Sequence, residues 1–170
     1  LGNDGHARKW DEILQFQGDP NSIILLQEVP LTQRQGKGGF VYFTRSGQAI
    51  TSWRNRFPDH TVHYADRDHS TRQESIITLS PRLLGNPKAI ELRIRNYNCY
   101  GLILIYEDAK LAVVNLHLIS LSQDAHEKIR ASQLDHLTGY AKENLSGFRI
   151  LIAGDINCEL PFWATCKTGQ

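Results

Sequence analysis

The sequence has no methionine among its 170 residues and opens on Leu1, so it lacks the start of a complete translation product. We therefore expect the natural protein to begin before Leu1. The sequence also lacks any apolar run near the roughly 20 residues that cross a bilayer, and no basic and then apolar leader opens it. The sequence as given therefore predicts a soluble domain without a transmembrane segment.

An excess of charge of one sign is missing as well, since 19 Lys and Arg against 18 Asp and Glu leave a net charge of +1. A protein that binds nucleic acid mainly through phosphate contacts usually carries a pronounced basic excess. Net charge therefore gives no support for such binding, although local basic clusters stay open. Cysteine is scarce, and Cys99, Cys158 and Cys166 do not have metal-ligand spacing. A disulfide between Cys158 and Cys166 stays open, and so does the redox compartment.

The composition that is present belongs to one globular domain. Hydrophobic residues make up 41% of the chain and charged residues 22%, which excludes a disordered or fibrous protein. No internal repeat, low-complexity tract or linker divides the sequence. We therefore predict a single domain over residues 1–170.

Short apolar runs predict a chain rich in strands. Such runs predict strands at residues 22–26, 39–44, 75–80, 89–94, 101–106, 111–118 and 149–153. Helical spacing predicts one helix that ends at Gln17 and a second over residues 122–143. We expect the strand at 149–153 to be buried and the rest of 31–68 to consist mainly of loops. This order predicts an α/β or α+β domain of layered, mixed sheets.

Polar side chains interrupt or end four of these apolar runs. They are Glu28, Glu74, Asn115 with His117, and Asp155 with Asn157. Each has an ordinary explanation, such as a turn-forming Asp and Asn, a surface carboxylate or a core histidine. A buried polar group without a partner costs on the order of several kcal/mol, so we expect these side chains to face one polar site. Alternation along the strand at 111–118 places Asn115 and His117 on one face.

Four segments carry a resemblance to a known family. LLQE, RQESIITLS, VVNLHL and LIAGDIN, in this order, resemble the motifs of the DNase I-like endonuclease/exonuclease/phosphatase superfamily, and Arg130 and Gln133 match its R-x-x-Q pattern. The resemblance covers residues 10–157 and implies a four-layer αββα sandwich of two mixed, mainly antiparallel sheets flanked by helices. The family's first strand and its closing Asp-His strand are missing. We therefore expect natural sequence beyond both ends, and exposed strand edges and apolar faces without it.

The resemblance also implies a role for each site residue in the metal-assisted hydrolysis of a phosphoester. Glu28 would bind Mg²⁺, with Mn²⁺ as the alternative ion. Asp155 would orient or deprotonate the attacking water, and Asn157 would hold that water or a phosphoryl oxygen. His117 would donate to the phosphate, and Glu74 would fix the tautomer of that histidine.

The activity that the resemblance implies is that of a Mg²⁺-dependent phosphodiesterase acting on nucleic acid, with DNA as the expected substrate of a DNase-type endonuclease. Two alternatives stay open: a phosphatase acting on a phosphoinositide or another small phosphoester, and a non-catalytic binding protein on the same scaffold. A binding protein need not keep polar groups at every strand end, which argues against the second alternative. The family's phosphate-contacting arginine stays unassigned between Arg93 and Arg95. Protein partners and compartment, secretion included, also stay open.

Overall fold

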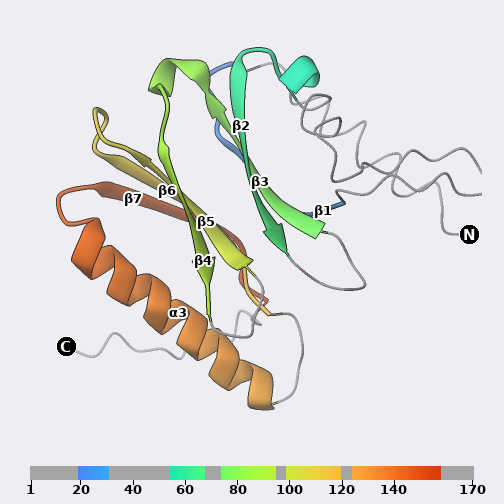
Figure 1. Ribbon diagram of the computed structural model, residues 1–170, viewed down its shortest axis with the longest axis vertical. Helices are drawn as coiled ribbons and strands as arrows, with labels where there is room; N and C mark the ends of the chain where they lie inside the picture. Colours follow the sequence, from blue (N-terminus) through green and yellow to red (C-terminus); the bar gives the residue numbers. More distant parts are fainter. Residues whose placement is uncertain (1–18, 31–53, 68–73, 95–98, 120–123, 158–170) are drawn as a thin grey trace, which may run out of the picture.

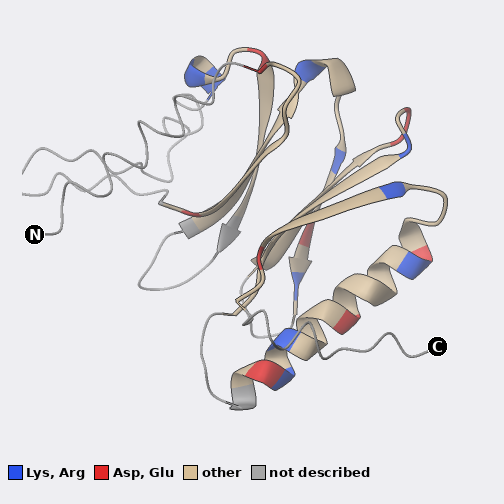
Figure 2. Ribbon diagram, turned by 180° about the vertical axis from the view of Figure 1, so that it is seen from behind, with Lys and Arg blue, Asp and Glu red and all other residues tan. Residues whose placement is uncertain are grey.

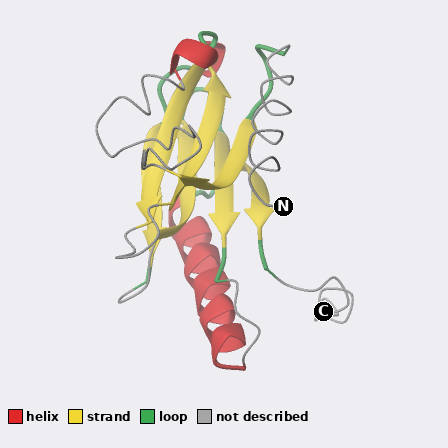
Figure 3. Cartoon of the chain, turned by 90° about the vertical axis from the view of Figure 1, so that its right-hand side faces the viewer, coloured by secondary structure: helices red, strands yellow, loops and turns green. Residues whose placement is uncertain are grey.

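Two facing β-sheets and one long helix form the part of the chain that the computed structural model describes (Figure 1). The described residues are 19–30, 54–67, 74–94, 99–119 and 124–157. Figure 3 shows the same arrangement from the side. The two sheets and the helix on one outer face correspond to three of the four predicted layers.

The first sheet is antiparallel and has the strand order β1-β3-β2. Its strands are β1 (Ile24–Pro30), β2 (His60–Arg67) and β3 (Glu74–Pro81). The strand predicted at 75–80 is confirmed as β3, which takes the central position. Strand β2 is not predicted from the sequence, because histidines and charged residues leave few apolar positions in that segment.

The second sheet has the strand order β4-β5-β6-β7. Its strands are β4 (Lys88–Arg93), β5 (Cys99–Tyr106), β6 (Leu111–His117) and β7 (Arg149–Asp155). β5 and β6 form the predicted antiparallel hairpin, whereas β6 and β7 are parallel. Parallel neighbours need a crossover of about a dozen residues or more, which α3 (Asp124–Asn144) provides. The helix predicted at 122–143 is thereby confirmed.

Apolar side chains fill the space between the sheets and the space between the second sheet and α3. Successive side chains of β6 point alternately into these two spaces. Val113 packs between the sheets, and Val114 packs with Leu137 of α3 on the other face. β5 does the same with Leu102 and Ile103. Because β5 and β6 are buried on both faces, their apolar runs are continuous in the sequence.

A polar contact also ties α3 to the second sheet. The hydroxyl of Tyr100 lies 2.7 Å from Nδ1 of His136. Burial raises the pKa of Tyr100, with a smaller contribution from the neighbouring Cys99, so the phenol stays protonated and is able to donate to that nitrogen. No helix among the described residues is both long enough and apolar enough to cross a membrane.

Three further predicted elements differ from the structure or fall outside it. The helix that ends at Gln17 and the strand at 39–44 lie outside the described residues. The strand predicted at 22–26 continues as β1 through Gln27 and Glu28 to Pro30. The carboxylate of Glu28 therefore lies within a strand and not at its end.

β7 is exposed along its whole length, so the prediction of a buried strand at 149–153 is wrong. Ile150, Leu151 and Ile152 are 41%, 45% and 52% exposed. Within the described part of the chain β7 pairs with β6 alone, at the edge of the sheet. Figure 2 shows charged residues only at the two ends of this strand. Its exposure therefore follows from its place in the sheet and not from a polar sequence.

Gly154 marks the point where β7 approaches β6 most closely. It lies opposite Leu116 in the parallel pair and has a φ of 138°, a conformation that residues with side chains rarely adopt. A Cβ atom at this position would collide with the backbone carbonyl oxygen of Leu116. Glycine is therefore needed for the two strands to pair up to their last residues.

Gly154→Ala should lower the free energy of unfolding by about 1–3 kcal/mol, because the strands must separate or the backbone must change. The matched control is Gly139→Ala in the middle of α3, where a Cβ has open space within 4 Å. This control should raise stability by about 0.5–1 kcal/mol, since alanine is the better helix former. Urea unfolding measures both variants, and equal stabilities would contradict the close approach of β6 and β7.

Candidate active site

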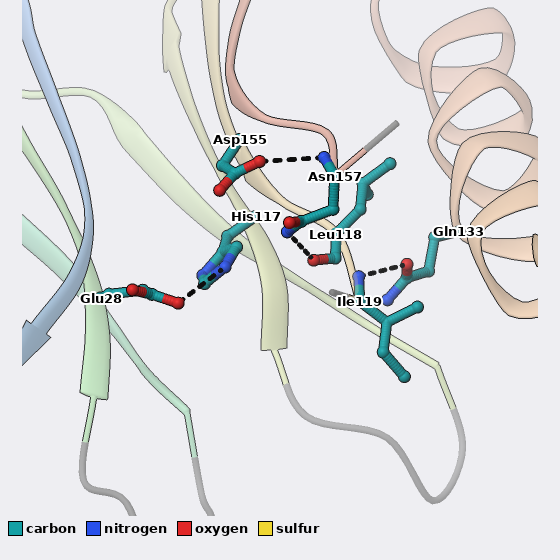
Figure 4. Close-up of polar contacts among 7 residues, drawn as sticks. All are labelled: Glu28, His117, Leu118, Ile119, Gln133, Asp155 and Asn157. Atoms are coloured by element: carbon teal, nitrogen blue, oxygen red, sulfur yellow. Dashed lines mark hydrogen bonds and ion pairs between the residues drawn. The ribbon is translucent and has the colours of Figure 1, made fainter. Parts of the chain in front are cut away.

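His117 and Asp155 lie side by side as the last residues of the parallel strands β6 and β7. Glu28 reaches His117 from β1 of the facing sheet, with its Oε1 3.5 Å from the Nε2 of the imidazole (Figure 4). The structure therefore brings together three of the predicted site residues, although they are far apart in the sequence.

A β-bulge sets the direction of Glu28. β1 pairs with β3 through Leu26 and Ile77 and next through Val29 and Ser75, so two residues of β1 face a single residue of β3. Glu28 lies in this bulge and has a φ of 54°, which is uncommon for any residue other than glycine. Such a conformation persists only where the surrounding structure enforces it, and it occurs often at functional sites.

The bulge also changes which residue packs in the outer apolar cluster of the first sheet. Ile24 and Leu26 pack in this cluster, and regular alternation would place Glu28 there next. Val29 takes that position and is 4% exposed. The bulge therefore keeps a carboxylate out of an apolar cluster and leaves it beside His117.

His117 and Glu28 differ widely in their access to solvent. The side chain of His117 is 1% exposed and that of Glu28 is 60% exposed. The two groups form an ion pair when His117 is protonated.

A turn at the end of β7 ties the two parallel strands together. Oδ1 of Asp155 accepts a 2.9 Å hydrogen bond from the backbone N–H of Asn157, as turn-forming Asp residues commonly do. Nδ2 of Asn157 donates to the carbonyl oxygen of Leu118 at 2.8 Å, and the N–H of Leu118 donates to the carbonyl oxygen of Asp155 at 2.9 Å. The ordinary role of these residues in a turn therefore also fixes the chain directly after His117.

Helix α3 holds the same segment from its other side. The backbone N–H of Ile119 donates to Oε1 of Gln133 at 3.3 Å, and Nη1 of Arg130 donates to the carbonyl oxygen of Ile119 at 3.1 Å. Both helix side chains are buried, since Gln133 is 3% exposed and Arg130 is 9% exposed. The R-x-x-Q pattern of the sequence therefore acts here by positioning the residues that follow His117.

Glu74 pairs with Pro30 across β1 and β3, next to the bulge, but its side chain lies outside the described residues. Its predicted contact with His117 therefore stays a prediction. Of the two arginines considered for phosphate binding, Arg93 makes an ion pair with Glu91 at 2.6 Å, and Arg95 lies outside the described residues.

Two further polar residues lie near the site: Asn115, which the sequence places among the polar residues of the site without a specific role, and Gln27, which it does not single out. Nε2 of Gln27, the residue before Glu28, donates to Oδ1 of Asn115 at 2.6 Å and so links the two sheets. Side-chain alternation gives part of this contact, because it places Asn115 on the inner face of β6 with His117 and places Gln27 on the same face of β1 as Leu25. What alternation does not show is that the two strands face each other.

Glu28 has the chemistry of a ligand for a hard divalent cation. Among the described residues there is no group of three or more His, Cys, Asp or Glu side chains that could hold a metal. Mg²⁺ does not need such a group, because it keeps several waters and uses one or two carboxylates together with substrate oxygens. The 60% exposed side chain of Glu28 therefore fits Mg²⁺ or Mn²⁺.

The two sheets and the crossover helix correspond to part of the αββα sandwich that the sequence resemblance implies, and two solved structures have a similar fold. Truncated TDP2 from Caenorhabditis elegans matches with a TM-score of 0.58 and 16% sequence identity, over 94% of this chain and 58% of that one. Another structure of TDP2 from C. elegans matches with a TM-score of 0.57 and 19% identity, over 94% of this chain and 45% of that one.

These similarities show the fold, and the chain spans about half the length of the TDP2 chains it matches. No family model and no curated protein matches the sequence. The roles of the individual site residues therefore depend on the geometry described above.

Asn157→Ala should loosen the segment after His117, because the carbonyl oxygen of Leu118 loses its donor. The matched control is Asn144→Ala, which removes the same kind of amide-to-carbonyl bond, 3.0 Å long, at the far end of α3. Hydrogen exchange of the Leu118 and Ile119 amides should accelerate about tenfold in the first variant only. Unchanged exchange in Asn157→Ala would contradict its role in holding β6 to β7.

Proposed function

We propose that this chain is a divalent-metal-dependent phosphodiesterase that hydrolyses nucleic acid, with DNA as its substrate and endonucleolytic cleavage as its activity. The observation that carries the proposal is that the β1 bulge places Glu28 beside His117, which ends β6 next to Asp155 at the end of β7. The fold adds support, because it is similar to that of TDP2 from C. elegans.

In this proposal Asp155 orients the attacking water or removes its proton. One carboxylate oxygen already accepts from the backbone of Asn157, but an ionised carboxylate has about four acceptor positions, so the group is able to accept from water as well. The bond from the backbone holds the carboxylate in one orientation, which is what a group that positions water requires.

His117 donates to a phosphoryl oxygen as negative charge grows in the transition state. Glu74 fixes the tautomer of this histidine. Asn157 uses one N–H of its amide for Leu118, and the second N–H of the same amide holds a phosphoryl oxygen or the attacking water.

Glu28 would hold Mg²⁺ or Mn²⁺, which when bound polarises the phosphoryl oxygen and neutralises its developing charge. A carboxylate that is 60% exposed suits this role, because substrate and water have access to the same place. The positive φ of Glu28 points the same way, since a strained residue lowers stability and is retained where its orientation serves a function.

A phosphatase acting on a phosphoinositide would use the same residues, so it enters the experiments below as the competing outcome. A non-catalytic binding protein on this scaffold would gain nothing from a strained Glu28 beside a buried His117. The geometry therefore favours an enzyme over a binding protein.

Glu28→Gln should raise the dissociation constant for Mg²⁺ at least about tenfold, because it removes the ligand charge and keeps the side-chain volume. The matched control is Glu107→Gln, which removes one carboxylate, 64% exposed and paired with Lys110, from the turn at the other end of β6. Calorimetric titration with Mg²⁺ compares the two variants. Equal affinities would exclude Glu28 as the ligand.

His117→Ala and Asp155→Asn should each lower turnover by a factor of about 10² or more, as the loss of an electrostatic or proton-transfer group does. The measurements are plasmid nicking and phosphate release from a phosphoinositide, side by side, with Mg²⁺ and with chelator. Phosphate release without plasmid nicking would show that the substrate is a phosphoinositide and not DNA. Wild-type turnover in either variant would show that its assigned role is wrong.

A further inference from the structure

Asn115 lies two residues before His117 on the same face of β6, and the proposed mechanism gives it no role. The residue is fully buried, with 0% of its surface exposed. Its side chain makes its hydrogen bonds with β1 and β3 of the facing sheet. Asn115 is therefore a polar link across the interior of the sandwich.

Every polar atom of the Asn115 side chain is engaged. Its Oδ1 accepts from Nε2 of Gln27 at 2.6 Å. Its Nδ2 donates to the carbonyl oxygen of Ile77 at 2.9 Å, to Oγ1 of Thr78 at 3.2 Å and, at 3.4 Å, to the carbonyl oxygen of Leu26. Two N–H hydrogens thus serve three acceptors, so at least one hydrogen is shared.

The chemistry of these partners fixes the orientation of both amides. The carbonyl oxygens of Leu26 and Ile77 are able only to accept, so the nitrogen of Asn115 must face them. Its oxygen must then face Gln27, which in turn must present its own nitrogen. A flip of either amide would bring two acceptors or two donors together, so the link has one stable arrangement.

The link contacts β1 at the place where the bulge begins. Leu26 and Ile77 form the last regular pair before the bulge, and Gln27 and Glu28 are its two residues. Asn115 therefore contacts both strands at the start of the bulge and also the side chain of its first residue. The second bulge residue is the one that faces His117.

We propose that Asn115 is a positioning residue that holds the β1 bulge and thereby keeps the carboxylate of Glu28 opposite His117. Because Asn115 and His117 lie on one strand and one face, a single element sets the place of the imidazole and of the bulge that aims the carboxylate. The consequence for metal binding rests on the proposed function, whereas the consequence for the bulge does not.

The apolar surroundings of Asn115 argue that its amide does more than fill space. Leu102, Leu104 and Val113 occupy neighbouring inner-face positions. An apolar side chain in place of Asn115 would pack among them and need no hydrogen-bond partner. A buried amide stabilises the fold only when its partners are in place, so it favours one arrangement of the strands over others. The arrangement it favours is the one with the bulge.

The test compares two variants of the full chain that each remove one partner of Asn115. Gln27→Met removes the donor on β1 and keeps the length of a half-buried side chain, whereas Thr78→Val removes an acceptor on β3 at equal volume. Hydrogen exchange without metal should accelerate about tenfold at residues 27–29 in Gln27→Met and stay near the wild-type rate there in Thr78→Val.

Mg²⁺ affinity provides the second measurement. Gln27→Met should raise the dissociation constant about tenfold, as the loss of a group that orients a metal ligand does, with little change in Thr78→Val. The hydrolysis rate of Gln27→Met should then recover at raised Mg²⁺ concentration, which a general loss of stability would not allow. Asn115→Leu should accelerate exchange at residues 27–29 as Gln27→Met does. The variant that combines Asn115→Leu with Gln27→Met should exchange at these residues little faster than either single variant.

Each outcome has a definite meaning. Equal exchange at residues 27–29 in Gln27→Met and Thr78→Val would overturn the role of Asn115 in holding the bulge. Faster exchange with wild-type Mg²⁺ affinity would overturn the link from the bulge to Glu28. If the wild-type chain binds no Mg²⁺ and hydrolyses neither substrate, the proposed function fails, while the exchange measurement still decides the role of Asn115.

Discussion

The parallel pairing of β6 and β7 is the constraint on which the rest of the candidate site depends. It requires a crossover, and the crossover helix α3 supplies Arg130 and Gln133, which hold the chain beyond His117. It also requires the close approach at Gly154, where a side chain would collide with β6. The result of this pairing is that Asp155 and His117 lie at neighbouring strand ends and share one supporting turn.

Among the described side chains, the facing sheet contributes Glu28 to this group, and it does so against the regular pattern of its strand. Alternation along β1 would direct Glu28 into an apolar cluster, and only the bulge directs it toward His117. A bulge with a positive φ has to be enforced by its surroundings, and the contacts of Asn115 with both strands lie directly beside it. The orientation of the carboxylate is thus a property of the whole sandwich.

Structural and chemical roles coincide at the end of β7. Asp155 and Asn157 form the turn that their residue types favour, and the same hydrogen bonds place a carboxylate beside an imidazole. The ordinary explanation of such residues and the functional one are therefore not exclusive. A turn residue is well suited to a catalytic role, because its backbone bonds already hold the side chain in one orientation.

Local periodicity alone determined the β5–β6 hairpin, helix α3, the face shared by Asn115 and His117, and the placing of polar residues near strand ends. Each of these depends on neighbours within a few residues along the chain, which the sequence displays directly. Tertiary structure decided the exposure of β7, the existence of β2, the direction of Glu28 and the partners of Asn115. These features depend on which strands become neighbours and in what register. An apolar run such as ILIA does not indicate whether its strand lies at the centre of a sheet or at its edge.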